Sequence, residues 1–541
     1  MKRFALLAAM AALAAVIVLT VRFGSPYAPV VAPAPEDIEA LWAIEDAREE
    51  SAYPLVTKLA CGGAPMAYNA QENTFYCTLG LENGETWPQL RLTAPDNPEL
   101  KLVFADDYTY DWCSDAVRDG YAYQVMAYND THFAYFDIVF TGLPMVMIET
   151  TQEITTEDSP IRVTMSAFGQ APLKSWGRIH KRGASTINSP KGSYKIEFTR
   201  ESDGRRKTSV DVPLFGTMDS LILNGMLHDD LFVRDKLSWA LYESLRPGDK
   251  PFGARSTQYA EVYIDGQYHG LYLLMNAMTC ADELSKDGAR AVTDSVYRTA
   301  VTSLSKDREY RVHPVRIDTC YELYHRQSET RPFDALEPWM DLIKTTDDDA
   351  FVKKALAHVD LASMVEFCLF VQAAGMTDNV FNNMYIIAHP TERGVVYSFA
   401  PWDMDMTWAR KPEEIGSNYE NWVYFPVADR MIHLNAGGAL RAQVGQVWTR
   451  MRETAFDEVH IHALLEGYAW ELSESGAWVR NAQRWEKESY YPDFYEIEAF
   501  VHTRFALIDS AVAVIAGDAE AEIPFLRDTQ YEGKGTPIVL E

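Results

Sequence analysis

The sequence predicts an α+β protein in which a β-rich part comes first and a largely helical part follows. Up to about residue 276, most apolar segments are short and rich in aromatic and β-branched residues, which favours strands. After Val359 the apolar residues mainly recur at helical spacing, as in LASMVEFCLFVQAAGM at 361–376. The chain also has 541 residues, too many for one compact core, so two or three domains are expected.

The first residues form an apolar run that predicts export. Lys2 and Arg3 precede residues 4–21, which carry no charge and are nearly enough to span a bilayer core as a helix. Basic residues before such a run favour keeping the N-terminus inside. We interpret residues 1–24 as a signal anchor, with a cleaved signal peptide as the alternative, followed by a Pro/Ala linker at 25–36. The bulk of the chain is then membrane-anchored and extracytoplasmic, or secreted.

Residues 37–145 are predicted to form a β-rich accessory domain. A short acidic helix is expected in EDIEALWAIEDAREE at 36–50. The segments YAYQVMAYN at 121–129 and HFAYFDIVF at 132–140 are rich in strand-forming residues and enclose Asn-Asp-Thr, which indicates a hairpin. The region contains no group of residues that indicates chemistry, so we expect it to serve contact or spacing.

Residues 146–541 are predicted to form a larger domain whose C-terminal part is helical. Strands are expected at 144–151, 161–167, 193–198, 382–389 and 395–403. The segment LFVRDKLSWALYESL at 231–245 predicts an amphipathic helix, and further helices are expected between about 438 and 516. The segment QYAEVYIDGQYHGLYLLMN at 258–276 predicts two strands joined by Asp-Gly, a strong hairpin signal.

The net charge and the cysteines exclude some functions. The net charge is −29, so general binding of nucleic acid or anionic lipid is not expected, and a basic protein partner is favoured. The six cysteines form no CxxC or Cys/His cluster, so a zinc site is not expected. In an exported chain, Cys61–Cys77 and Cys280–Cys320 are candidate disulfides, whereas Cys368 is expected to be a buried free thiol.

The strongest chemical signal is a set of acidic and amide residues after the helix at 361–376. Asp378 and Asn383 follow that helix, and Asp403 and Asp405 lie in APWDMDMTWA at 400–409, among apolar residues. Phosphoryl transfer needs a carboxylate that orients the acceptor hydroxyl and oxygen ligands for Mg²⁺. A D-x-x-x-x-N loop followed by a hairpin and another Asp is the order in which protein kinases place these groups.

Each of these residues also has an ordinary structural explanation. Asp378 and Asn383 are residue types common in caps and turns, and Asp403 and Asp405 could form structural salt bridges. Trp402 and Trp408 are expected to be core residues. The order of the groups at short range is what favours a metal-bound nucleotide phosphate.

A cationic phosphate clamp is expected in HKRGASTINSPKGSYKIEF at 180–198. A Lys near or on a strand and aimed into a cleft can hold phosphates, and both Lys191 and Lys195 fit this description. Alternation places Lys195 and Glu197 on one face of the strand. The plain alternative is that both lysines are solvated. The sequence has no GxxxxGK[ST], so a P-loop enzyme is excluded.

Together these segments resemble the spore coat protein H (CotH) kinase family of bacteria, which are atypical protein kinases. The likeness rests on four blocks, which are RGASTINSPKGSYKIEF, LNGMLHDDLFVRDKLSWAL, AEVYIDGQYHGLYLLMN, and DNVFNNMYII with APWDMD. The tail segments VRNAQRW and TRFALID also look familial, so the resemblance covers residues 145–515. One departure is that Met275 and Asn276 stand where the family usually has an acidic residue after GLYLL.

The resemblance implies a divergent, two-lobe, protein-kinase-like fold that uses ATP and Mg²⁺, or Mn²⁺, to phosphorylate Ser or Thr of a coat or cell-surface protein. By position in the family's motifs, the resemblance implies that Asp378 is the catalytic residue. It implies that Asn383 and Asp403 are metal ligands, with Asp405 next to them. The residues that it implies on the nucleotide side are Lys191 or Lys195, Arg182, Asp229 and Arg234.

Three other functions compete with this interpretation. A surface or coat assembly protein could keep the kinase-like shape without catalysis, and Asn276 favours it mildly. A glycosyltransferase using the Asp-x-Asp is disfavoured because no parallel βα alternation precedes it. Glycoside hydrolysis is disfavoured because two Asp residues on one strand face are too close together.

Overall fold

The computed structural model describes residues 38–81, 92–97, 99–105, 113–183, 186–246, 253–277, 295–300, 321–325, 331, 333–345, 347–380, 382–410, 422–423, 425–486, 493–517 and 523. The predicted signal anchor and the linker lie outside these residues, as do Cys280 and Cys320.

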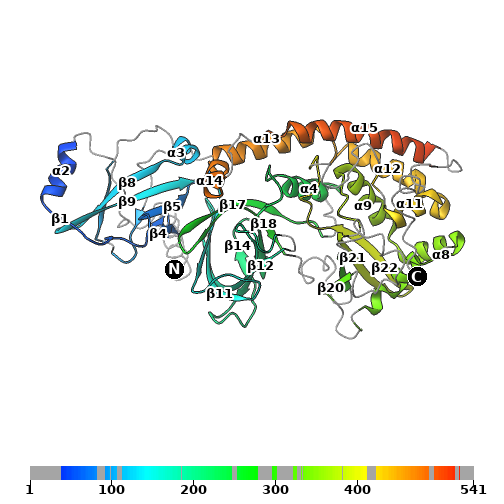
Figure 1. The fold of residues 1–541 in the computed structure, drawn as a ribbon, viewed down its shortest axis with the longest axis horizontal. Coiled ribbons are helices and arrows are strands. Elements are labelled where there is room, and N and C mark those ends of the chain that lie inside the picture. The colour runs from blue at the N-terminus through cyan, green and yellow to red at the C-terminus, as the bar shows by residue number, and fades with distance from the viewer. Residues whose placement is uncertain are drawn as a thin grey trace, which may run out of the picture. The chain divides into compact units, whose positions relative to one another are not determined.

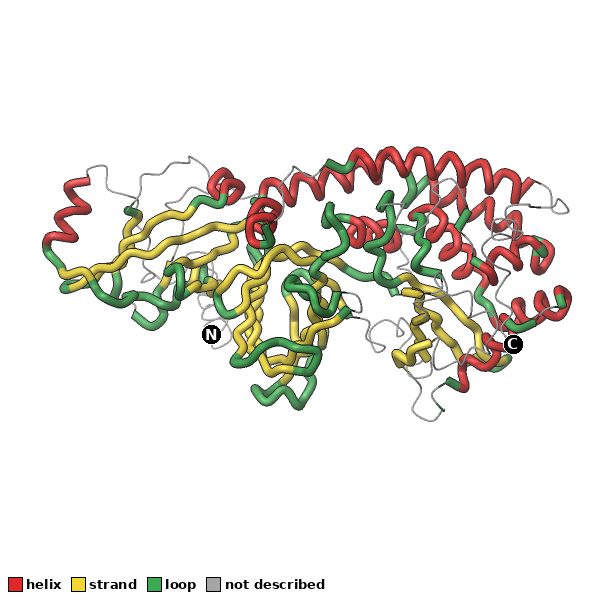
Figure 2. Tube along the Cα trace, in the orientation of Figure 1, coloured by secondary structure: helices red, strands yellow, loops and turns green. Residues whose placement is uncertain are grey.

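The chain divides into two compact units. The first contains Met1–Gly225, Gln258–Leu274 and Ala469–Tyr491, and the second contains Met226–Thr257, Met275–Tyr468 and Pro492–Glu541. Figure 2 shows that the first unit is built mainly of strands, whereas the second combines a sheet with most of the helices. The prediction of an α+β protein is therefore confirmed.

A six-stranded sheet forms the N-terminal part of the first unit (Figure 1). The strands run in the order β4–β5–β9–β8–β7, and β1 pairs with β9. The elements of this part are α2 Ile38–Asp46, β1 Glu49–Glu50, β2 Ala60–Cys61, β3 Ala64–Pro65, β4 Ala67–Asn69, β5 Thr74–Thr78, β6 Leu92–Thr93, β7 Lys101–Phe104, α3 Cys113–Asp119, β8 Ala122–Tyr128 and β9 His132–Thr141. The predicted hairpin is confirmed, because β8 and β9 are antiparallel neighbours.

A closed seven-stranded barrel, in the order β10–β11–β12–β13–β16–β18–β17, completes most of the first unit. Its strands are β10 Met145–Thr150, β11 Ser159–Ser166, β12 Leu173–Arg182, β13 Ser193–Thr199, β16 Ser220–Asn224, β17 Thr257–Ile264 and β18 Gln267–Asn276, with the hairpin β14 Val210–Val212 and β15 Gly216–Met218 beside it. Ile196 and Phe198 fill the barrel core. The Asp-Gly hairpin is also confirmed, with positive φ angles of 50° at Asp265 and 80° at Gly266.

The second unit contains a four-stranded sheet in the order β20–β19–β21–β22. Its strands are β19 Ser295–Ala300, β20 Tyr321–His325, β21 Asn382–Thr391 and β22 Gly394–Pro401. The helices are α4 Arg234–Glu243, η3 Asp334–Leu336, α7 Glu337–Ile343, α8 Asp348–His358, α9 Leu361–Ala374, α11 Pro426–His433, η4 Ala436–Gly438, α12 Leu440–Arg452, α13 Glu458–Glu474, which continues into the first unit, α14 Ala477–Arg484 in the first unit, and α15 Tyr495–Gly517.

The structure confirms the sequence prediction for helix α9 and contradicts it for helix α4. α9 is buried along its length, as predicted, and begins where the Asp360 carboxylate accepts a hydrogen bond from Ser363 N at 3.2 Å. α4 was predicted to be amphipathic, and this is wrong. Asp235 and Lys236 in its first turn are buried, because Asp235 accepts a hydrogen bond from Met404 N and the Lys236 ammonium lies over the Tyr468 ring.

The cysteines agree with the prediction in one case and differ in another. Cys368 is a fully buried free thiol, as predicted. Cys61 and Cys77 are also free, so the candidate Cys61–Cys77 disulfide is not formed. A hydrogen bond with Cys61, together with burial, raises the pKa of the Cys77 thiol.

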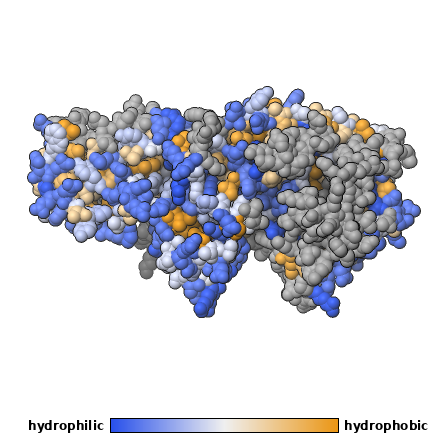
Figure 3. All heavy atoms as spheres, in the orientation of Figure 1, coloured by the Kyte–Doolittle hydropathy of each residue, from blue (hydrophilic) through white to orange (hydrophobic). Residues whose placement is uncertain are grey.

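Among the described helices, α15 is long and apolar enough to cross a membrane by length and composition. Its residues Phe500, Phe505 and Ile508 are buried, which is the pattern of a helix in a protein core. In the view of Figure 3, the described surface is mostly hydrophilic, with apolar residues scattered among the polar ones.

Candidate functional site

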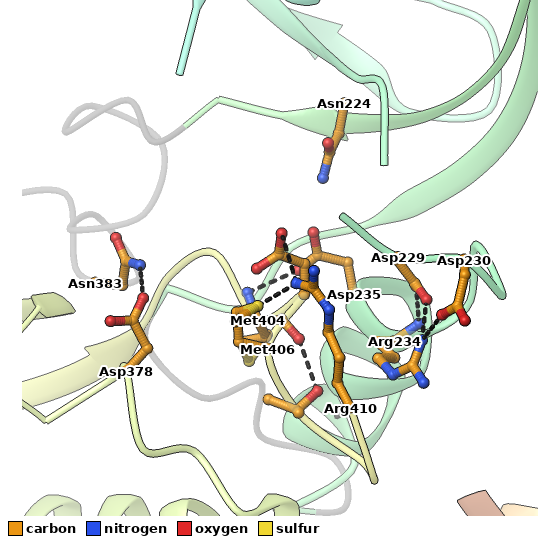
Figure 4. A network of polar contacts seen from close by, with 12 residues as sticks. Asn224, Asp229, Asp230, Arg234, Asp235, Asp378, Asn383, Met404, Met406 and Arg410 are labelled. Carbon is orange, nitrogen blue, oxygen red and sulfur yellow. Dashed lines mark hydrogen bonds and ion pairs between the residues drawn. The ribbon is translucent and has the colours of Figure 1, made fainter. Parts of the chain in front are cut away.

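Asp378 lies in the turn that follows α9. Gly375 ends the helix in the left-handed conformation, with φ of 65°, and Met376 N donates to the Val371 carbonyl at 3.0 Å. The half-buried Asp378 comes directly after this turn. Its Oδ2 accepts a hydrogen bond from Asn383 Nδ2 at 2.8 Å, as Figure 4 shows. The predicted catalytic carboxylate therefore lies beside a predicted metal ligand.

Asn383 and Asp403 lie at the open end of one hairpin. β21 begins at Asn382 and β22 ends at Pro401, and the turn that joins these strands is at the opposite end. Trp402 N donates to the Asn383 carbonyl at 2.9 Å, which extends the pairing up to the residue before Asp403. The antiparallel register therefore brings the D-x-x-x-x-N and WDMD segments together.

Both predicted ligands have a strained backbone. Asn383 has φ of 51° and Asp403 has φ of 55°, in the left-handed region that favours glycine. Such a conformation costs about 1–3 kcal/mol per residue and persists where the surrounding structure enforces it. Asn and Asp adopt this conformation more readily than other non-glycine residues, and here it sets the direction of two candidate ligands at one hairpin end.

The Asn379 side chain fixes the backbone at Asn383 and just before Asp403. Its side chain is fully buried, and Nδ2 donates to the Asn383 carbonyl at 3.2 Å and to the Trp402 carbonyl at 2.5 Å. One amide group thus connects the segments that carry Asn383 and Asp403.

The loop after β22 is fixed to α4. Met404 N donates to Asp235 Oδ1 at 2.9 Å, and Thr407 Oγ1 donates to the Met404 carbonyl at 2.7 Å. Trp408 Nε1 donates to Ser238 Oγ at 2.7 Å. These contacts orient the WDMD loop so that Asp403 is exposed while Asp405 is mostly buried. Trp402 and Trp408 are buried, as predicted.

The loop concentrates negative charge. Burial and the neighbouring carboxylates of Asp403, Asp235 and Asp229 raise the pKa of Asp405 well above its ordinary value, although Arg410 opposes this effect at 4.0 Å. Burial, and then Asp403, raises the pKa of Asp378, against the hydrogen bonds from Asn382 and Asn383. A bound cation would relieve this repulsion.

The pKa of His228, near the same loop, is lowered rather than raised. Burial, followed by the Arg410 charge, lowers the pKa of His228, and Asp403 opposes the shift. The imidazole is therefore favoured in its neutral form near this loop.

Asp229 and Arg234 form a buried pair that shapes the start of α4. Asp229 accepts hydrogen bonds from Leu231 N at 3.1 Å, from Arg234 N at 2.6 Å and from the Arg234 guanidinium at 2.5 Å. Asp230 also accepts from this guanidinium, at 2.8 Å. Both Asp229 and Arg234 are almost completely buried. The expected bracing role is consistent with these contacts.

The predicted phosphate clamp belongs to the first unit. Lys191 is buried, and its ammonium lies 5.2 Å from the centre of the Tyr272 ring. Lys195 is partly exposed and forms an ion pair with Glu197 at 2.8 Å, so the two share one strand face, as predicted. Arg182 is partly exposed at the end of β12.

The donor set suits a hard cation that also binds phosphate. The candidates are the carboxylates of Asp403 and Asp405 and the Asn383 carboxamide, whose oxygen points away from Asp378 in Figure 4. Within the part of the chain that the structure describes, no group of three or more His, Cys, Asp or Glu side chains is arranged to hold a metal. Mg²⁺ is usually held by one or two carboxylates together with substrate phosphates rather than by a complete protein cage.

Sequence reasoning missed Asn379, Asp235 and His228. Asn379 is of a residue type common in caps and turns, and only the meeting of β21 and β22 shows its bridging contacts. Asp235 was read as part of an amphipathic helix. A buried position for this acidic residue could have been suspected from the apolar residues around it in FVRDKLSWAL, but its partner in the loop is distant in sequence.

Comparison with known proteins gives one finding. A family model described as CotH kinase protein matches residues 179–508, which is more than half of the chain and includes every residue of the candidate site. No curated protein matches the chain significantly.

Proposed function

The chain belongs to the CotH kinase protein family, and we propose that it transfers the γ-phosphoryl group of ATP, with Mg²⁺ or Mn²⁺, to Ser or Thr of a partner protein. Family membership indicates a kinase-like function. The observation that supports the reaction most strongly is the hairpin end where Asp378, Asn383 and Asp403 meet, with two of the three in a strained conformation. Protein kinases place a catalytic Asp, a metal-binding Asn and a metal-binding Asp in the same order.

In this proposal each side chain has a separate task. Asp378 accepts the hydrogen bond of the acceptor hydroxyl and takes up its proton during transfer, and its raised pKa suits a base that must hold that proton. Asn383 and Asp403 would hold the metal, with Asp405 beside them. The metal, when bound, neutralises charge on the β- and γ-phosphates.

The nucleotide side is proposed by position in the family. Lys191 or Lys195, together with Arg182, would contact phosphate, and the choice between the two lysines stays open. Asp229 and Arg234 would brace α4, whose Asp235 orients the WDMD loop. Lys195→Ala and Lys191→Ala variants should show which lysine contacts ATP, because only the loss of that lysine should weaken ATP binding.

Location and partner are also part of the proposal. The apolar N-terminal run supports a membrane-anchored, extracytoplasmic or secreted kinase. The run would attach it to the membrane, and a basic coat or surface protein would be its substrate rather than nucleic acid.

A second candidate is an assembly protein with weak or no catalysis. One observation favours it, namely that Asn276, which replaces the family's usual acidic residue, accepts a hydrogen bond from Ser256 N at 2.9 Å and so has a structural task. The second candidate predicts partner binding that does not depend on ATP.

The experiment is phosphate transfer from labelled ATP to a basic protein rich in Ser and Thr, and to the chain itself. The full chain should transfer phosphate, whereas Asp378→Asn should bind ATP and metal but transfer more slowly by a factor of about 10²–10⁴. An unchanged rate in this variant would remove Asp378 from the catalytic role. ATP binding without transfer by the wild type would favour the assembly protein.

A further inference from the structure

The C-terminal end of α9, just before Asp378, is held by a contact from another helix. The last four carbonyls of an α-helix have no partner inside the helix, and they carry its partial negative charge. The Gln372 carbonyl is one of them in α9, and it accepts a hydrogen bond from Arg504 Nε at 2.7 Å. Arg504 lies on α15, which packs against α9 (Figure 1). An arginine distant in sequence therefore caps the helix that leads to Asp378.

The buried guanidinium contacts the same glutamine twice. Its Nη2 also donates to Gln372 Oε1, at 3.3 Å. Arg504 is 1% exposed, and burial lowers the pKa of its guanidinium to about 10, so it remains charged at neutral pH. Burial of a charge costs free energy, and the negative end of a helix dipole offsets part of that cost. The charge of Arg504 thus lies where a cation stabilises a helix end.

The Gln372 side chain extends the effect of Arg504 to a third segment. Its Oε1 accepts a hydrogen bond from Val423 N at 2.6 Å, and its Nε2 donates to the Val423 carbonyl at 2.7 Å. Because Arg504 binds the same Oε1, it favours the orientation of the amide that Val423 requires. One buried arginine therefore connects α15, the end of α9 and the segment that precedes α11.

Phe500 lies one helical turn before Arg504, so the two side chains share one stripe of α15. A Cβ atom at Gly375 would lie 3.1 Å from the Phe500 ring, so this ring approaches the glycine that ends α9. Trp408 packs edge-on against the same ring, with 6.4 Å between the ring centres. Trp408 N also donates to the Ala374 carbonyl at 3.0 Å. The stripe therefore contacts both the end of α9 and the loop that follows β22.

We propose that Arg504 is a positioning residue, which fixes the end of α9 and thereby places Asp378 for transfer. The inference rests on the proposed function, because it concerns the reaction at Asp378, four residues after the last residue of α9. Asn379 fixes the hairpin end at Asn383 and just before Asp403 through separate contacts. Loss of Arg504 should therefore displace Asp378 more than the metal side, and lower the rate of transfer rather than the affinity for ATP.

The first test is transfer of phosphate from labelled ATP by the full chain. Arg504→Met keeps a long apolar side chain, and it should lower kcat by about 10–100-fold, the effect of a displacement of about 1 Å, while KM for ATP stays within about twofold. Arg504→Lys keeps one charged donor and should recover part of the rate. Unfolding temperatures show whether each variant is folded, and where Arg504→Met is not, Arg504→Lys gives the same test with a smaller loss.

The matched control is Arg441→Met. Arg441 is also a buried arginine that donates to carbonyls at a helix end, in this case to those of Ile432 and His433 in α11. Its loss removes the same kind of contact from a helix that does not lead to Asp378. The control should therefore keep the wild-type kcat.

A double variant shows whether Arg504 acts through Asp378. In the Asp378→Asn background, the added Arg504→Met should change the rate by less than about twofold, because residues that act as one unit have non-additive effects. Fully additive losses would overturn the proposal. So would an Arg504→Met protein in which KM for ATP rises while kcat is unchanged.

Hydrogen exchange separates failure of this inference from failure of the proposed function. Gly375 N and Trp408 N donate to carbonyls at the end of α9. Arg504→Met should speed the exchange of these amides at least about tenfold, as expected for the loss of a hydrogen bond from a charged group, whereas Arg441→Met should not. A wild type that transfers no phosphate would refute the proposed function, and the exchange would still decide whether Arg504 fixes the end of α9. Unchanged exchange of these amides would overturn the inference.

Discussion

At the scale of single residues, the site depends on side chains that hold other groups in place. Asn383 and Asp403 keep left-handed backbone conformations because their neighbours are fixed from two directions. Asn379 binds the carbonyls of Asn383 and Trp402, and Asp235 binds the backbone of Met404. The strain is thus maintained by buried polar contacts in the second unit.

We predict that Asn379→Ala destabilises the second unit and weakens metal binding. The substitution leaves the Trp402 carbonyl without this buried donor, at a cost of about 1–3 kcal/mol, whereas the Asn383 carbonyl keeps its hydrogen bond from Trp402 N. The unfolding temperature and the affinity for Mg²⁺ with ATP should both fall. The comparison is Asn382→Ala, which removes a hydrogen bond to Asp378 but leaves the Trp402 carbonyl bonded, so its unfolding temperature should fall less. Unchanged metal affinity in a folded Asn379→Ala protein would contradict the positioning role.

We predict that Asp405→Asn stabilises the protein without ligands. The raised pKa of Asp405 means that the folded state binds its proton more tightly than the unfolded state does. Its contribution to stability therefore falls as pH rises from its unfolded value, and removal of the charge should help at pH 8 by about 0.5–2 kcal/mol. Thermal unfolding measures the gain.

The same variant should lose part of its stabilisation by ATP with Mg²⁺, because a carboxylate beside the metal has become an amide. If Asp405→Asn gains stability without ligands but keeps its full stabilisation by ATP with Mg²⁺, Asp405 lies outside the metal site. No gain at pH 8 would mean that Arg410 already compensates the charge.

At the scale of elements, the hairpin β21–β22 and the helix α9 do most of the positioning. Both could be predicted from sequence, because α9 is a long apolar run ended by Gly375 and the strands flank a clear turn. The amphipathic reading of α4 failed because its charged first turn is enclosed by the WDMD loop, a partner distant in sequence. Local patterns do not contain such contacts.

We predict that His269 makes the barrel lose stability in mild acid. Burial, followed by the charges of Arg484, Lys191 and Lys181, lowers the pKa of His269 to about 4. The unfolded side chain titrates near 6.5, so the unfolded state binds more protons between these values. The stabilisation is complete above about pH 6.5 and is lost as pH falls toward 4, by at most about 3 kcal/mol.

The measurement is the unfolding temperature at pH 7 and pH 5 for the wild type and His269→Gln. Glutamine stays neutral and can still bond with the Tyr194 hydroxyl, which His269 Nε2 contacts at 3.1 Å. The difference between the two pH values should shrink in the variant. An equal difference in both proteins would assign the acid sensitivity to other groups.

At the scale of the whole molecule, the sequence predicted the order of β-rich and helical parts and the hairpins, but not that a barrel closes. Closure depends on β10 pairing with β17, which is far away in the chain. The candidate site was predictable where its residues cluster in sequence, as in Asp378 with Asn383. Contacts from α4 required the folded structure.

The most direct measurement of the central claim is thermal stabilisation of the full chain by ATP with Mg²⁺ or Mn²⁺, beside Asp403→Asn. The matched control is Asp349→Asn, an exposed position in the first turn of α8. At ATP concentrations about 100 times the dissociation constant, binding should stabilise the wild type and the control by about 2.7 kcal/mol, only when metal is present. Asp403→Asn should lose this shift. Metal-independent stabilisation, an equal shift in all three proteins, or no shift with either metal would contradict a nucleotide-bound metal at the WDMD loop.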